Sequence, residues 1–488
     1  MSREDLEASG DVQGSPASRG WLHNWDVVDQ RKTSFWQRLT PPQLFVGSFL
    51  LLIAIGTLGL KALPGLYTGE SLGWLDALFT AVSAVCVTGL IVVDTATYFT
   101  PTGQAFILLL IQLGGLGMIT FTTVIIAALG RRLSLRQQSL AASSAEIIPD
   151  LDYRRLTRDV VVFTLALEAV GAVLLYLLWI PRFGWGGAAW PALFHSISAF
   201  CNAGFSTFTD SLTGFRAAPY TLLVIMALIV VGGIGFLVLE ELYLRARTGE
   251  AGRRFRISLH TRLVLATTAV LIVGGWILFT AFEWRITFAG MPDRVKVLNG
   301  LFLSVTARTG GFNTIDYGEA AANTNFLTML LMFVGGSPGS TAGGLKTTTI
   351  ALVALLAWSR FRGRVVVHLW DRSIRDESVQ RAVGLVVVGV GLVTAAIFVY
   401  TTSEIGAVGH AGVARGFLAY AFEAVSAINT VGLTMGVTAG LSPFGKVFTM
   451  LLMFLGRVGP ITFAAALALS ASPRAGRIRN AYEDVVVG

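Results

Sequence analysis

The sequence predicts an all-α membrane protein built from four repeats, and three observations support this fold class. Of the 488 residues, 54% are hydrophobic and only 14% are charged, whereas soluble domains carry about 25% charged residues. The apolar residues form continuous runs of about 20, the length of helix that crosses a bilayer. A membrane-spanning β-barrel would instead show alternating segments of about 10 residues. The third observation is a motif that occurs four times.

Each copy of this motif is a short run of small and apolar residues that ends in a glycine followed by a bulky apolar residue. The copies are Val82–Leu90, Ile197–Phe205, Ser304–Phe312 and Val425–Leu433. Their closing glycines are Gly89, Gly204, Gly311 and Gly432, at intervals of 115, 107 and 121 residues. Four diverged copies at nearly even spacing predict four repeats with pseudo-fourfold symmetry around one axis, which we interpret as one pore.

Every copy lies between two long apolar segments and includes or follows the end of a shorter one. The long segments predict eight transmembrane helices at Gln43–Leu63, Pro101–Leu129, Arg158–Ile180, Pro219–Leu244, Thr261–Glu283, Asn325–Trp358, Arg381–Thr402 and Pro443–Ser470. The short runs are Trp74–Ala84, Trp190–Phe200, Val295–Thr306 and Gly412–Ala427. Because these runs are too short to cross a bilayer, we expect four re-entrant pore helices. The helix–pore-loop–helix repeats then span residues 43–130, 158–245, 260–358 and 378–470.

Basic residues predict the orientation of the chain. Of the 37 Lys and Arg residues, 26 lie in the two tails and the three linkers between repeats, and 8 lie in the segments on the other side. Because cytoplasmic loops carry the excess of Lys and Arg, we expect a multi-pass protein of the cytoplasmic (inner) membrane with both termini in the cytoplasm. The polar tails, residues 1–42 and 471–488, are then cytosolic, and no signal peptide is expected. The net charge of +8 reflects these loops rather than a basic soluble domain, so we expect no nucleic-acid partner.

Acidic residues lie in the predicted outer segments, and acidic groups at a pore mouth concentrate cations. These residues are Glu70, Asp94, Asp210, Glu283, Asp316, Glu319 and Glu404. The alternative is that they are scattered, solvated loop charges.

The glycine-ended segments have the chemistry of an ion-selectivity filter. Potassium channels replace the water around the ion with rings of backbone carbonyls. Carbonyls that all point inward need unusual backbone angles, which glycine reaches without steric cost. We predict that potassium binds to the carbonyls of three residues in each repeat, here called the strips. The strips are Val87, Thr88 and Gly89; Asn202, Ala203 and Gly204; Thr309, Gly310 and Gly311; and Thr430, Val431 and Gly432. The alternative is four glycines at tight helix crossings in an ordinary bundle.

A gate is predicted in the third repeat, where residues 335–349 read G-G-S-P-G-S-T-A-G-G-L-K-T-T-T. Five glycines, a proline and several hydroxyl groups cannot continue a regular helix, so we expect a flexible intramembrane loop. A nucleotide-binding P-loop does not fit, because Leu345 separates Gly344 from Lys346 and no strand precedes the run. A helix kink without gating is the alternative. The predicted gate comprises Gly335, Gly336, Ser337, Pro338, Gly339, Ser340, Thr341, Ala342, Gly343, Gly344, Lys346 and Arg457.

Arg457 belongs to this gate because an arginine at membrane depth is costly and usually has a function or a partner. Beside a cation filter its charge would oppose permeation; a salt bridge inside the bundle is the alternative. Arg308, one residue before a strip, is expected to brace its pore helix. The two cysteines, Cys86 and Cys201, lie in different repeats, so we expect free thiols. The histidines show no metal-ligand spacing, and potassium at the strip carbonyls is the only metal expected.

The chain resembles the Trk/Ktr/HKT potassium-transporter superfamily, and within it the bacterial Ktr-type membrane subunit. The resemblance rests on V-C-V-T-G-L, T-A-R-T-G-G-F-N-T, G-G-S-P-G-S-T-A-G-G-L-K and G-R-V-G-P. It implies a homodimer in the lipid bilayer with one pore per subunit. It also implies a cytosolic ring of nucleotide-binding regulatory subunits (KtrA-like) that bind ATP or ADP, no covalent cofactor on this chain, and sodium stimulation.

The function predicted from these observations is potassium uptake through a gated, channel-like pore. Broken helices near the midplane also occur in coupled cation symporters, which is the alternative within transport. A membrane-embedded enzyme would need a paired acid and base or a metal site. Glu168 and Glu240, the acidic residues at membrane depth, have no matching His or Cys cluster in the sequence, so no enzymatic activity is expected.

Overall fold

The structure is a computed structural model that describes residues 41–118, 153–250, 257–364, 366–370, 372–406 and 414–459. The predicted tails, 1–42 and 471–488, lie outside these residues except for Pro41 and Pro42. These two prolines open helix α1 (Pro41–Ala62), because proline has the backbone angle of a first helical turn and needs no hydrogen-bond acceptor there.

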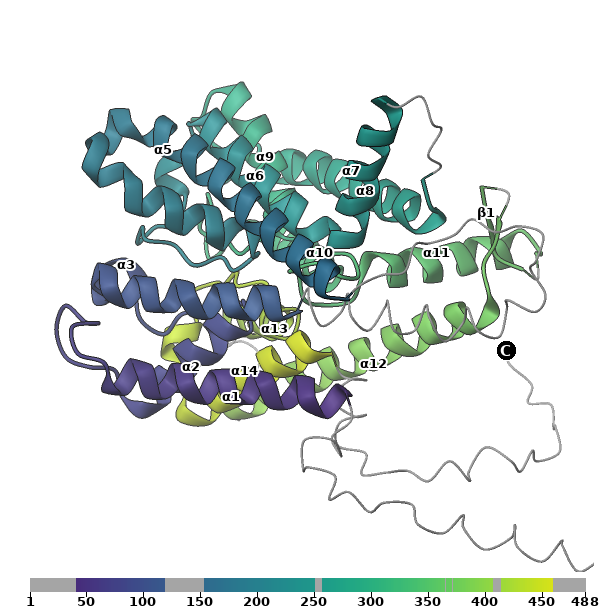
Figure 1. Ribbon diagram of the computed structural model, residues 1–488. Helices are drawn as coiled ribbons and strands as arrows, with labels where there is room; N and C mark the ends of the chain where they lie inside the picture. The colour runs from purple at the N-terminus through teal and green to yellow at the C-terminus, as the bar shows by residue number, and fades with distance from the viewer. Residues whose placement is uncertain are drawn as a thin grey trace, which may run out of the picture.

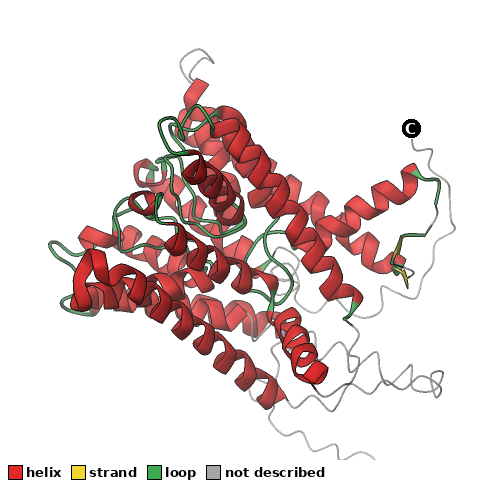
Figure 2. Cartoon of the chain, turned by 90° about the horizontal axis from the view of Figure 1, so that it is seen from above, coloured by secondary structure: helices red, strands yellow, loops and turns green. Residues whose placement is uncertain are grey.

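The described residues are almost entirely helical (Figure 2), apart from a two-residue antiparallel hairpin of β1 (His368–Leu369) and β2 (Arg372–Ser373). Five described helices are long and apolar enough to cross a membrane. They are α1, the unlabelled helix Pro101–Met118, α5 (Tyr153–Phe200), α8 (Leu259–Glu283) and α12 (Asp376–Tyr400), which continues as the π-helix η3 (Thr401–Ile405). Large apolar side chains on these helices, such as Leu51 and Val270, remain exposed on the protein, as expected for surfaces that face lipid.

Two of the eight predicted transmembrane helices are broken within the described residues, and a third is described only in part. The segment predicted at Pro219–Leu244 is a pair, α6 (Pro219–Ile234) and α7 (Phe236–Glu250), bent by 102°. The bend lies at Gly235, which has φ 97°, an angle that glycine adopts readily. The segment predicted at Asn325–Trp358 is α10 (Ala322–Phe333) and α11 (Thr347–Phe361), separated by residues 334–346. The segment predicted at Pro443–Ser470 begins as α14 (Pro443–Val458), and its remainder lies beyond the described residues.

The four short runs predicted as pore helices are helical where the structure describes them, and each leads directly into a glycine motif. Gly412 and Val413, at the start of the run Gly412–Ala427, lie outside the described residues. Three are separate: α2 (Trp74–Val85), α9 (Asp293–Thr306) and α13 (Ala414–Ile428). The fourth is the last part of α5, which joins the two segments predicted for the second repeat across a break at Gly184, where φ is 71°. Short helices elsewhere are α3 (Thr95–Tyr98), η2 (Thr213–Phe215) and η5 (Thr438–Gly440).

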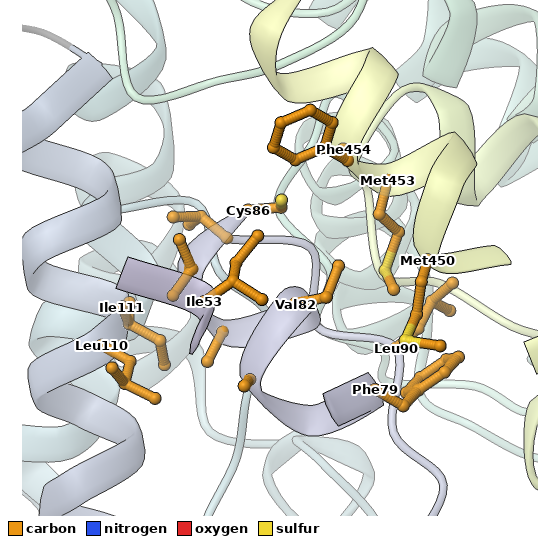
Figure 3. Close-up of a cluster of buried hydrophobic side chains, with 14 of the residues drawn as sticks. Ile53, Phe79, Val82, Cys86, Leu90, Leu110, Ile111, Met450, Met453 and Phe454 are labelled. Atoms are coloured by element: carbon orange, nitrogen blue, oxygen red, sulfur yellow. The ribbon is translucent and has the colours of Figure 1, made fainter. Parts of the chain in front are cut away.

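Neighbouring repeats pack against one another through these helices. In Figure 1, α1, α2, α13 and α14 form the lower half of the structure and α5, α6, α8 and α9 the upper half. Helix α14 packs on α2, α6 on α9 and α10 on α13. Figure 3 shows how α2 is fixed: Val82 and Cys86 lie in an apolar cluster with Ile53 of α1, Ile111 of helix 101–118 and Met453 of α14. The first repeat therefore contacts the fourth, and burial of apolar area holds α2 in place.

Glycines in the long helices allow three pore helices to end against helix backbone. In each case a Cβ built on the glycine would lie about 2 Å or less from the carbonyl oxygen of the last pore-helix residue. The pairs are Gly114 with Val85 (2.0 Å), Gly232 with Phe200 (1.9 Å) and Gly456 with Ile428 (1.9 Å). A methyl group at any of these positions would have to displace backbone, so only glycine fits.

We predict that Gly456→Ala destabilises the protein, because its Cβ would collide with the Ile428 carbonyl and overpacking costs about 1–3 kcal/mol or more. The measurement is the apparent melting temperature of the purified protein in detergent. Gly274→Ala is the control, since a Cβ there meets nothing within 4 Å. Equal melting temperatures for the two variants would contradict the tight contact.

Candidate functional site

The four strips lie immediately after the ends of the four pore helices. Eleven of their twelve residues are buried, and Gly204 is half-buried. Within each strip the first and third residues have positive φ angles. The first residues are Val87 (55°), Asn202 (59°), Thr309 (66°) and Thr430 (50°). The third residues are the closing glycines Gly89 (92°), Gly204 (71°), Gly311 (75°) and Gly432 (90°). The four repeats thus share one unusual backbone conformation.

This conformation extends the sequence-based expectation, which assigned unusual angles to glycine. Val87, Thr309 and Thr430 are β-branched, and a β-branched residue with positive φ is a genuine outlier. Outside the strips, only two described non-glycine residues, Ser211 and Trp370, have positive φ. Such strain persists only where surrounding structure fixes it, and it clusters at functional sites.

A hydroxyl group near the end of each pore helix holds the adjoining strip. In the first and fourth repeats, Ser83 Oγ and Ser426 Oγ accept hydrogen bonds from the amides of Gly89 (3.2 Å) and Gly432 (3.1 Å). In the other two repeats the hydroxyl donates to the carbonyl after the closing glycine. These bonds are Ser198 Oγ to Phe205 O (2.7 Å) and Thr306 Oγ1 to Phe312 O (2.6 Å). Sequence reasoning missed these residues, although three of them lie six positions before their glycine.

The strips meet one another in cyclic order. A Cβ on Gly89 would lie 2.3 Å from Ala203 O, and a Cβ on Gly204 would lie 2.7 Å from the Cα of Gly311. A Cβ on Gly311 would in turn lie 2.6 Å from Val431 O, and one on Gly432 would lie 2.1 Å from Thr88 O. The first strip therefore contacts the second, the second contacts the third, the third contacts the fourth, and the fourth contacts the first. The four segments therefore surround a common centre, with backbone against backbone.

Residues 334–346, here called the crossing segment, lie against the fourth strip and against the end of the pore helix in the second repeat. The segment is closed on itself, since the Gly335 amide donates to Leu345 O (2.9 Å) and the Thr347 amide to Gly336 O (3.0 Å). The Thr341 hydroxyl donates to Phe200 O (3.1 Å) and to Gly232 O (3.0 Å), both in the second repeat. On the other side, a Cβ on Gly343 would lie 2.0 Å from Thr430 Oγ1 in the fourth repeat.

Three cationic residues fix the crossing segment through carbonyl groups. Arg457 is fully buried, and it donates from Nη1 to Thr341 O and from Nη2 to Gly114 O (3.1 Å). Lys346 donates to Ala342 O within the segment (2.7 Å). Arg308, which was expected to brace its pore helix, donates from Nη2 to Gly335 O of the crossing segment (3.3 Å). None of these three forms a salt bridge with a carboxylate of the described residues.

The acidic residues expected at the outer mouth fall into two groups. Glu283 is fully buried and accepts hydrogen bonds from the Ala321 amide (2.9 Å) and the Thr287 hydroxyl (2.7 Å). Glu404 accepts from the Ser442 hydroxyl (2.6 Å), and Asp94 caps α3. These three accept hydrogen bonds within the protein and so stabilise local structure. The other four, Glu70, Asp210, Asp316 and Glu319, are exposed.

Polar groups at membrane depth form one further cluster. Glu168 is buried and accepts from Gln112 Nε2 (3.0 Å) and Cys201 Sγ (3.7 Å), and so links the first two repeats. Both cysteines are free. Among the described residues, no group of three or more His, Cys, Asp or Glu side chains is placed to hold a metal ion.

Comparison with known proteins places the whole repeat region in one family. The model of the family TrkH, described as a cation transport protein, matches residues 43–474. The chain belongs to this family. As a TrkH-family member it is a membrane transport protein, which confirms the expectation that it is not an enzyme.

Curated relatives cover nearly the whole chain. The protein is 36% identical to the potassium/sodium uptake protein NtpJ of Enterococcus hirae, over 93% of this chain and 98% of that one. It is 37% identical to the Ktr system potassium uptake protein B of Bacillus subtilis, over 91% of this chain and 96% of that one. The crystal structure of the potassium transporter TrkH from Vibrio parahaemolyticus matches with a TM-score of 0.69 at 17% identity, over 88% and 86% of the two chains. That similarity shows a shared fold.

We predict that Gly311→Ala abolishes cation flux through this TrkH-family protein in liposomes. Its Cβ would lie 2.6 Å from both Val431 O and the Gly204 Cα, at a φ of 75°, so the ring of strips must deform. Gly436→Ala is the matched control, because Gly436 also has positive φ (86°) but has no atom within 4 Å of the added Cβ. A well-folded Gly311→Ala protein with unchanged flux would show that the ring does not line the ion path.

Proposed function

We propose that the chain is the pore-forming subunit of a Ktr-type potassium uptake system, which admits potassium across the cytoplasmic membrane through one gated pore. The observation that carries this proposal is the cyclic contact of four strips with one shared backbone conformation. Two relatives that align over more than nine-tenths of their length are named as potassium uptake proteins, one in full as a potassium/sodium uptake protein. Four helix–pore-loop–helix repeats with eight transmembrane helices are part of the proposal.

The strips act as the selectivity filter in this proposal. In a regular strand, successive carbonyls point to opposite sides, because all of its residues have similar φ and ψ angles. Left-handed residues at the first and third positions interrupt that alternation and favour carbonyls on the same side. Carbonyls of the three residues in each strip then replace the hydration shell of a potassium ion at the common centre. The hydroxyl anchors hold the strips at the spacing that this substitution requires.

The crossing segment and Arg457 act as the gate. In the described conformation the segment lies against the fourth strip and the end of the second pore helix, and Arg457 links its Thr341 carbonyl to that of Gly114 in the first repeat. Opening must break these bonds and those of the Thr341 hydroxyl. The fixed charge of Arg457 adds an electrostatic barrier, since like charges repel strongly where the surroundings are apolar. Release of the segment and displacement of the arginine together let a cation pass.

The assembly proposed for this subunit follows the Ktr-type resemblance. Two copies form a homodimer in the bilayer with one pore each. A cytosolic ring of nucleotide-binding subunits binds ATP or ADP and acts on the crossing segment. Exposed arginines at the end of α11 and in the connection to α12, including Arg360, Arg362 and Arg372, support a cytoplasmic position for this connection. Both termini are then cytoplasmic, and sodium stimulation belongs to the same proposal.

A direct test of the proposed function is potassium flux into liposomes that contain the purified protein. A potassium gradient should drive flux that saturates at the membrane potential set by potassium, and sodium alone should not replace it. Potassium flux equal to that of empty liposomes, from protein shown to be folded, would overturn the proposal.

Coupled cation symport is the second candidate, and the potassium/sodium name of the Enterococcus hirae relative favours considering it. The two candidates differ in their reversal potential. A pore gives a reversal potential that follows the potassium gradient alone. A symporter gives one that also shifts with the gradient of sodium or protons.

We predict that Arg457→Ala raises potassium flux several-fold, because it removes both the fixed charge and the two hydrogen bonds to carbonyl oxygens. Arg457→Lys separates these causes, since lysine keeps the charge but cannot span two carbonyls with a planar fork. A flux for Arg457→Lys near that of the alanine variant assigns the barrier to the hydrogen bonds. A flux near the wild-type value assigns it to charge. Unchanged or lower flux in folded Arg457→Ala would count against a gating role.

A further inference from the structure

A small cavity lies between helices α6, α8 and α9, beside the crossing segment. It is bounded by residues of α6, α8 and α9, by Arg308 and by Gly336 of the crossing segment, and its volume is about 10 Å³. That volume suits about one water molecule. The cavity is outside the ring of strips, because its lining includes none of the twelve strip residues.

Two buried polar atoms in the lining have no hydrogen-bond partner. Arg308 is 8% exposed, and its Nε–H donates to nothing, although Nη2 donates to Gly335 O. Thr268 of α8 is 6% exposed, and its Oγ1 is likewise unpartnered. Buried polar groups in native proteins are nearly always satisfied, by protein or by ordered water. Two unsatisfied atoms on one water-sized cavity therefore indicate a ligand that can pair with both.

The chemistry of the lining favours water over an anion. Arg308 Nε–H needs an acceptor, and Thr268 Oγ1 can accept or donate. The backbone of Gly233 and Gly336 and apolar side chains form the rest of the lining, so Arg308 is the only cationic group there that could hold an anion. Water is also smaller than chloride, the anion most available to the protein.

We propose that one ordered water molecule bridges Thr268 Oγ1 and Arg308 Nε and makes Thr268 a positioning residue for the crossing segment. The water ties α8 to Arg308, which precedes the third strip by one residue and holds Gly335 O at the start of the crossing segment. Loss of the Thr268 hydroxyl removes one of the groups that orient the guanidinium. Arg308 then holds Gly335 less firmly, and the crossing segment leaves its closed position more often. The effect on flux rests on the proposed gate, whereas the water site itself does not.

Three variants test the proposal. Thr268→Val removes the hydroxyl with little change in shape, and Thr268→Ser retains it. Thr267→Val removes the neighbouring hydroxyl, which does not line the cavity, and serves as the control. The first readout is density for a solvent molecule in a cryo-EM map or crystal structure that resolves ordered waters. The second is potassium flux in liposomes.

We expect a density peak within hydrogen-bonding distance of both atoms in the wild type and in Thr268→Ser, and none in Thr268→Val. We expect Thr268→Val to raise flux about threefold to tenfold, the effect of about one net hydrogen bond, while Thr268→Ser and Thr267→Val match the wild type. An empty cavity in the wild type overturns the site, as does an anomalous bromide signal there after chloride is replaced. Equal flux in the two valine variants, with the water present, overturns the positioning role alone. Absence of potassium flux in the wild type would instead contradict the proposed function, and the test of the water site by density would still hold.

Discussion

At the centre of the described residues, four closing glycines bring backbone into contact with backbone, and this contact sets the demands on everything around it. A side chain at Gly89, Gly204, Gly311 or Gly432 would overlap a neighbouring strip. Segments that approach this closely cannot be positioned by interlocking side chains of their own. Their position must come from the elements behind them, which is the task of the pore helices, their terminal hydroxyl groups and the glycines of the long helices.

The same requirement explains the breaks in the long helices. A pore helix that ends at a helix backbone needs glycine there, and consecutive glycines weaken the helix that carries them. Helix α6 ends just before Gly235 and α14 just before Gly459. The break is longest in the third repeat, where thirteen residues separate α10 from α11. The crossing segment is thus an enlarged form of a feature present in other repeats. Its carbonyls are the groups that Arg457, Arg308 and Lys346 hold.

Much of this arrangement could be predicted from the sequence, because apolar run length and glycine spacing are local signals. The mostly helical fold was predicted correctly, and the structure has helices at the four short runs and a break between α10 and α11 at the predicted glycine-rich stretch. Positive φ at Val87, Thr309 and Thr430 could not be, because β-branched residues normally avoid that region and only tertiary contacts hold them there. The hydrogen-bond partners of Arg457 could not be predicted either, because they lie 116 and 343 residues away in the sequence. Continuous hydropathy concealed the 102° bend at Gly235, because an apolar run reads the same whether it is straight or broken.

The central claim is that the four strips enclose the path of a dehydrated potassium ion. Anomalous scattering from crystals of the protein in rubidium or thallium, which substitute for potassium, tests it most directly. The account predicts peaks at the common centre of the strips, at the level of their backbone carbonyls. Absence of peaks there, with ion density elsewhere or with side chains filling the centre, would contradict it.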